Sequence, residues 1–155
     1  MTFFGVSRIV GAIVLVGTIG VTALAIADDF DPIAARRALM KQDGQSSKLL
    51  FDMAQGTVPF DAAKATEAAT AVSKLGHTFA TEFDKYFPDA SKTGDTKASP
   101  DIWANKDDVK KRFASLEADA QAIAAAAPNG ADAFKAAFAK LGGNCKGCHE
   151  KYKMQ

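Results

Sequence analysis

The sequence predicts an all-α protein, an antiparallel four-helix bundle. Alanine dominates from Ala62 onward and β-branched residues become sparse after the first few dozen positions, a composition typical of helices. Four segments place apolar residues three and four positions apart, which is the period of a helix with one buried face. No segment alternates with the period of two expected of a half-buried strand, so we expect no sheet.

The first 27 residues are expected to be a signal peptide. Arg8 supplies a small positive region, an apolar run covers 9–26, and Ala25-Ile26-Ala27 is a small-x-small cleavage site. The run is close to the length that spans a bilayer, so an uncleaved anchor is the alternative. Residues 28–155 are then the mature domain, which we expect in the periplasm and on a membrane only if the segment is retained.

The first two helices have clear start signals. Asp31-Pro32 combines a capping carboxylate with a proline at the first helical position, and this helix is predicted to end near Met53. Asp61 caps the second helix, which Phe87-Pro88 closes. Its stripe consists of Ala65, Ala69, Val72, Leu75 or Gly76, Phe79 and Phe83.

A long polar connection separates these helices from the last two. The stretch 89–101 has no periodicity and is expected to be exposed, with Ile102-Trp103 pinning it to the body. Pro128-Asn129-Gly130 separates the third helix from the fourth. The third stripe is Val109, Phe113, Leu116, Ala120, Ile123 and Ala127, and the fourth is Phe134, Phe138, Leu141, Cys145 and Cys148.

Charge and composition exclude some functions. The formal net charge is +1, so no basic field is present to hold nucleic acid. We find no nucleophile, general base or paired carboxylates in a catalytic arrangement, and we predict no enzyme.

The chemistry lies in Cys145-Lys146-Gly147-Cys148-His149, the Cys-x-x-Cys-His motif of c-type haem attachment. Residues three apart share one helix face, so both thiols can bond to vinyl groups along one porphyrin edge. His149 can then ligate the iron. A redox dithiol, a zinc site that adds His77, and a plain disulfide are the competing interpretations.

The mature chain resembles the class II cytochromes c, the family of cytochrome c prime and its low-spin relatives. The resemblance rests on the run from Cys145 to Lys153, on Ser99 to Trp103, on Tyr86-Phe87-Pro88, and on Arg36 to Gly44. It implies a four-helix bundle with one covalent haem c near the C-terminal helix. It also implies a homodimer through the first two helices as an option.

The resemblance implies roles for two residues of the first helix. Met40, within Leu39-Met40-Lys41, matches the position where low-spin members have an iron-binding methionine, although some members only pack a methionine there. Arg36, one turn earlier, would reach a haem propionate, with a solvated arginine as the alternative. Trp103 is expected to pack near the haem edge.

Three functions follow from these interpretations. In the first, His149 and Met40 close both axial positions and the protein carries single electrons. Its redox partner would be acidic, attracted by the lysines around the motif. These lysines are Lys140, Lys146, Lys151 and Lys153. In the second function, Met40 only packs and the five-coordinate iron binds NO or CO. The third is a structural bundle without haem.

Overall fold

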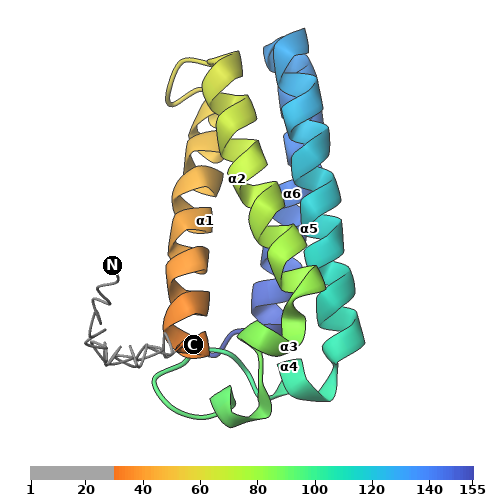
Figure 1. The fold of residues 1–155 in the computed structure, drawn as a ribbon. Helices are drawn as coiled ribbons and strands as arrows, with labels where there is room; N and C mark the ends of the chain where they lie inside the picture. The colour runs from red at the N-terminus through yellow and green to blue at the C-terminus, as the bar shows by residue number, and fades with distance from the viewer. Residues whose placement is uncertain (1–29) are drawn as a thin grey trace, which may run out of the picture.

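The computed structural model describes residues 30–155, and the predicted signal peptide at 1–27 lies outside them. Four long helices run antiparallel, and the predicted bundle is confirmed (Figure 1). Within the described part there is no strand, only an isolated antiparallel bridge between Ala98 and Lys153. No described helix is both long and apolar enough to cross a bilayer. The long helices are α1 (Pro32–Gln55), α2 (Ala62–Thr81), α5 (Lys106–Ala126) and α6 (Ala131–Tyr152).

Both predicted helix caps are confirmed. The Asp31 carboxylate accepts hydrogen bonds from the backbone N–H groups of Ile33 at 2.8 Å and Ala34 at 3.1 Å. The Asp61 carboxylate accepts one from the N–H of Lys64 at 3.0 Å. These bonds satisfy amides that a helix N-terminus leaves without partners. α1 continues two residues past the expected end and stops at a left-handed glycine, Gly56, with φ 75°.

The second predicted helix is broken near its end. α2 stops at Thr81, and a short helix α3 (Phe83–Tyr86) continues after Glu82, whose φ of −105° and ψ of 29° are not helical. The Thr81 hydroxyl donates to the carbonyl one turn earlier at 2.8 Å, a contact that often bends helices. The bend lets Phe83 enter the core and stack on Phe87, with ring centroids 4.7 Å apart.

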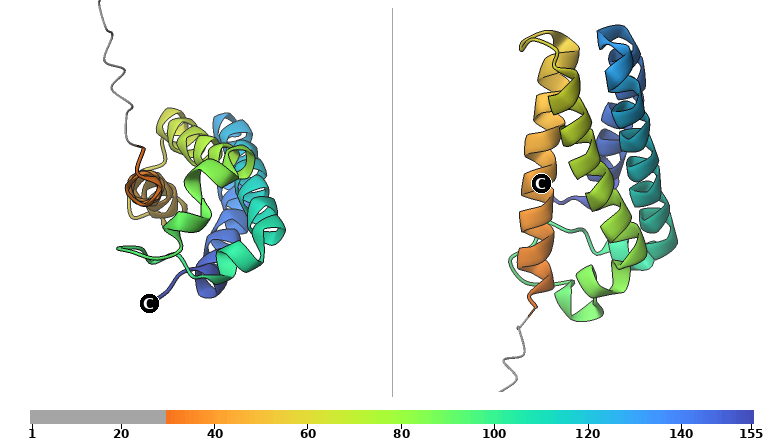
Figure 2. Two further views of the ribbon diagram at one scale, coloured as in Figure 1. Left: turned by 60° about the horizontal axis from the view of Figure 1, so that its bottom comes forward. Right: turned by 45° about the horizontal axis from the view of Figure 1, so that its top comes forward.

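The four helices pack in a ring. α1 lies beside α2, α2 beside α5, and α5 beside α6, while the contact between α6 and α1 is the smallest of the four (Figure 2). The α2–α5 contact is the most extensive, because Gly76 lets the backbones approach. A Cβ at Gly76 would lie 2.7 Å from the Glu117 nitrogen and 2.8 Å from the Phe113 oxygen. The bundle is therefore tight on the α2–α5 side and loosest between α1 and α6.

The connection between α3 and α5 is more ordered than expected. It contains the short helices η1 (Asp89–Ser91) and α4 (Asp101–Ala104), and η2 (Ala127–Asn129) follows α5. Ser91 is buried, although the sequence predicted an exposed stretch. Ile102 and Trp103 are buried as expected, and the Trp103 indole N–H donates to the Phe87 carbonyl at 2.9 Å.

Candidate functional site

The motif residues of α6 and a methionine of α1 line the same small pocket. Cys145, Cys148 and His149 approach it from α6, Met40 from α1, and Arg112 from α5. The site is therefore on the side of the bundle where helix contact is smallest. The complete lining is Met40, Asp43, Arg112, Leu116, Asn144, Cys145, Cys148 and His149.

The two thiols are free and half-buried. Burial, with a further contribution from Asp43, raises the pKa of the Cys145 thiol to about 11. Burial also raises the pKa of Cys148, while the nearby Arg112 guanidinium opposes that shift. Both sulfurs are consequently protonated at neutral pH and share the helix face that the spacing predicted.

His149 lies at the exposed edge of the pocket. Partial burial of the ring, together with the charge of Lys153, lowers the pKa of His149 below its usual value. The neutral imidazole, which is the form that ligates metals, is therefore favoured at neutral pH.

The zinc alternative required His77 to join the motif. The His77 ring instead lies 3.2 Å from the Glu117 carboxylate on an exposed part of the α2–α5 surface. Among residues 30–155, no three His, Cys, Asp or Glu side chains come together as a metal site. The structure does not bring the proposed zinc ligands together.

Met40 differs in placement from the other methionines of the described part. It is half-buried, packs against the core and lines the pocket opposite α6. Met53 is fully buried near the far end of α1, and Met154 is exposed beyond the end of α6. Of these three, Met40 alone places a thioether in the pocket that holds the thiols and the imidazole.

The donor atoms of the pocket residues fit a c-type haem, but the cavity between them is too small to hold one without movement of the helices. Two thiols, an imidazole and a thioether are the donor set for covalent attachment and axial ligation. The cavity measures about 30 Å³, which is smaller than a porphyrin, so the helices that line it lie further apart when haem is bound. The Asp43 Oδ1 and Ser47 Oγ atoms of α1 are buried without a hydrogen-bond partner among the described residues. Moving α1 therefore breaks no hydrogen bond at those atoms.

Arg36 connects α1 to the long connection rather than lining this pocket. One Nη donates to the Tyr86 carbonyl at 2.5 Å and to the Ser91 hydroxyl at 2.7 Å. The other donates to the Ser91 carbonyl at 3.2 Å and to Thr96 Oγ1 at 3.4 Å. Its guanidinium also lies over the Phe87 ring, 4.9 Å from the centroid. The side chain is 5% exposed, so the solvated alternative is wrong.

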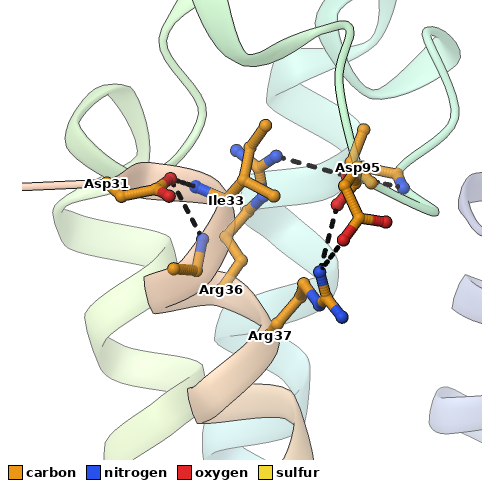
Figure 3. A network of polar contacts seen from close by, with 8 residues as sticks. Asp31, Ile33, Arg36, Arg37 and Asp95 are labelled. Atoms are coloured by element: carbon orange, nitrogen blue, oxygen red, sulfur yellow. Dashed lines mark hydrogen bonds and ion pairs between the residues drawn. The ribbon is translucent and has the colours of Figure 1, made fainter.

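The predicted contact between Arg36 and a haem propionate stays a prediction. Both Nη atoms of Arg36 donate to the connection, so the N–H on Nε is the one that they leave for such a contact. Figure 3 shows Arg36 and its neighbour Arg37 extending from the start of α1 toward the segment around Asp95. Arg37 makes an ion pair with Asp95 there. Both arginines thus fix the connection against α1.

Sequence reasoning missed a polar cluster next to the motif. Asp108 accepts hydrogen bonds from the Tyr152 hydroxyl at 2.5 Å, the Arg112 Nε at 2.9 Å and the Lys151 Nζ at 3.4 Å. These donors hold the pKa of Asp108 far below its usual value. The spacing of four between Asp108 and Arg112 was the available signal, because such pairs share a helix face. Nothing in the sequence indicated that Tyr152 completes the cluster.

Comparison with known proteins also supports a c-type haem at this site. The profile of the family described as cytochrome C' matches residues 31–153. Cytochrome c-556 of Agrobacterium tumefaciens (strain II Chrys) is 37% identical over 79% of this chain and 97% of its own. The structure of cytochrome c' from Rhodopseudomonas palustris is 33% identical, covers 81% of this chain and 98% of its own, and superposes with a TM-score of 0.74.

A further solved cytochrome c', described as having ligand-controlled dimer dissociation, is 27% identical with a TM-score of 0.70. That similarity covers 81% of this chain and 98% of the other. Dimers therefore occur among the structural relatives. The chain belongs to the cytochrome c' family, the class II cytochromes c, and is a haem protein with covalently attached haem c.

Proposed function

We propose that this protein is a periplasmic single-electron carrier whose haem is attached through Cys145 and Cys148. His149 is the proximal ligand and Met40 is the sixth ligand. The observation that supports this proposal is the shared pocket, in which Met40 of α1 faces the motif residues of α6. The bound haem supplies an iron that alternates between the ferric and ferrous states.

The chain's own residues define what that iron can do. A thioether is a soft ligand that favours the ferrous state and raises the reduction potential. If His149 and Met40 both held the iron, they would leave no position open to an exogenous ligand. Closed coordination supports electron transfer and leaves no place for a substrate, so we infer that the protein is not an enzyme.

The alternative is a five-coordinate haem that binds NO or CO, with Met40 only packing beside the iron. The names cytochrome c' and cytochrome c-556 both occur among the relatives, so family membership does not choose between the two. A haem between α6 and α1 needs the same separation of these helices whether Met40 binds the iron or only packs beside it, so the pocket does not choose between the two either.

An acidic redox partner and a homodimer complete the proposal. Lysines surround the motif, but Lys146 lies 3.7 Å from the Glu150 carboxylate and Lys151 lies 3.4 Å from Asp108. Lys140 and Lys153 are exposed and make no ion pair within the described part of the chain, so these two would attract the partner. A homodimer would use α1 and α2, the helices that the family resemblance implies.

The test replaces the Met40 sulfur without making a cavity. Met40→Leu keeps the side-chain volume, and Met53→Leu is the matched control in the same helix. Visible spectra are recorded for the oxidised and reduced proteins, with and without carbon monoxide. Intact mass shows whether haem is attached.

The parent protein and Met53→Leu are expected to be low-spin and resistant to carbon monoxide, whereas Met40→Leu becomes high-spin and binds it. A parent protein that is high-spin and binds carbon monoxide would establish the five-coordinate alternative. A polypeptide mass without haem, from exported material, would contradict both.

A further inference from the structure

Arg112 brings a positive charge into the pocket from α5. Its Nε–H donates to Asp108, one helical turn earlier, at 2.9 Å, and this bond fixes the guanidinium. Gly147, inside the Cys-x-x-Cys-His motif, lies against it: a Cβ at Gly147 would be 3.6 Å from the Arg112 Nη1. The guanidinium therefore lies alongside the segment between the two cysteines.

The end of this guanidinium is available for an additional contact. Neither Nη atom of Arg112 donates a hydrogen bond to another residue in the described part of the chain. Arginine has five N–H donors, so four of those of Arg112 are not donated within the described part of the chain. Arg36, the arginine that the family resemblance favoured, has both Nη atoms committed to the connection after α3. Arg112 is consequently better placed than Arg36 to contact a haem in this pocket.

Asp108 gives the same region a fixed negative charge. It accepts from the Tyr152 hydroxyl at 2.5 Å, and Tyr152 is 3% exposed and lies three residues after His149. Asp108 thus joins α5 to the last turn of α6, which bears the proximal histidine. Arg112 and Asp108 place opposite charges at known positions beside the motif.

We propose that Arg112 faces the haem and that the Arg112–Asp108 pair sets the reduction potential of its iron. This inference rests on the proposed function, because it requires the haem between α1 and α6. Electron uptake from a redox partner converts ferric to ferrous iron without making or breaking a bond, and it adds one negative charge. A nearby positive charge therefore favours reduction, and a nearby negative charge opposes it. The Arg112 side chain is 31% exposed, so solvent screens it incompletely.

The test measures the midpoint potential of the haem-loaded protein by spectroelectrochemical titration. The variants are Arg112→Gln, Arg112→Lys and Asp108→Asn, with Arg37→Gln as the control. Arg37 is an exposed arginine that pairs with Asp95 and does not line the pocket. Intact mass and helical circular dichroism accompany each titration, so that haem attachment and folding are recorded independently of the potential.

We expect Arg112→Gln to shift the potential downward and Asp108→Asn to shift it upward. Arg112→Lys should stay near the parent value because the charge is kept, and Arg37→Gln should not move it. A purely structural role would reduce stability in both Gln and Asn variants without potential shifts of opposite sign. Unchanged potentials in haem-loaded, folded variants would overturn this inference while leaving the proposed function intact.

Two other outcomes are decisive as well. If Arg112→Gln does not fold, the direction of the Asp108→Asn shift decides, and a downward or absent shift refutes the pair. If the parent mass shows no haem, the proposed function fails first, and this inference fails with it.

Discussion

Gly76→Ala is the substitution whose effect on stability follows most directly from the packing of α2 against α5. The added methyl carbon would lie 2.7 Å from the Glu117 backbone nitrogen and 2.8 Å from the Phe113 backbone oxygen. Backbone atoms inside a helix cannot rotate away as a flexible side chain can. The two helices must therefore separate over the most extensive contact in the bundle.

Two opposing effects determine the magnitude. Overpacking of a well-packed core costs about 1–3 kcal/mol, and a clash with backbone belongs at the upper end of that range. Replacing glycine by alanine inside a helix returns about 1 kcal/mol. The net loss in the free energy of unfolding is about 2 kcal/mol, or roughly 8 °C in Tm for a domain of this size.

Gly143→Ala is the matched control. Gly143 is an exposed glycine within α6, and nothing lies within 4 Å of where its Cβ would be. Only the gain in helix propensity applies there, so stability should stay the same or rise by up to about 1 kcal/mol. Thermal and urea unfolding followed by circular dichroism measure both variants. A Gly76→Ala protein as stable as Gly143→Ala would refute the close approach of α2 and α5.

Three further predictions concern the connection and the pocket. Arg36→Met should lower the free energy of unfolding by about 3 kcal/mol, because it removes charge-assisted hydrogen bonds to buried Ser91, and urea unfolding measures the loss. Trp103→Phe should cost about 1–2 kcal/mol through the lost indole bond, and an unchanged Tm would contradict that contact. Burial raises the pKa of Asp43 from 3.8 to about 6, so its ionisation destabilises the fold increasingly as pH rises between those values. Asp43→Asn should therefore be more stable than the parent at pH 7, by on the order of 2 kcal/mol, with no difference at pH 3. An equal difference in stability at both pH values would show that the ionisation of Asp43 is not the cause.

The helices and the motif were predictable because their causes are local. Apolar spacing, the Asp31 and Asp61 caps and the order of elements all follow from neighbouring residues, and the bundle is confirmed. The spacing of Cys145 and Cys148 likewise determines that they share one face of α6. These features do not depend on how the helices pack together.

The features that could not be predicted depend on contacts between distant segments. The sequence predicted one continuous helix up to Phe87-Pro88. The helix breaks after Thr81, because burying Phe83 against Phe87 outweighs helix continuity. The burial of Arg36 could not be predicted, because the connection that covers it has no periodicity. The Arg112–Asp108–Tyr152 cluster depends on the rotation of α5 against α6, which apolar periodicity alone does not give.

The iron position in crystals of the haem-loaded protein, located by anomalous scattering, tests the central claim most directly. We predict iron between α6 and α1, bonded to the imidazole of His149 on one side and to the sulfur of Met40 on the other. Continuous density should join both cysteine sulfurs to the porphyrin edge. Iron bonded to His149 with the Met40 sulfur out of bonding range would contradict the electron-carrier account and leave the gas-binding one.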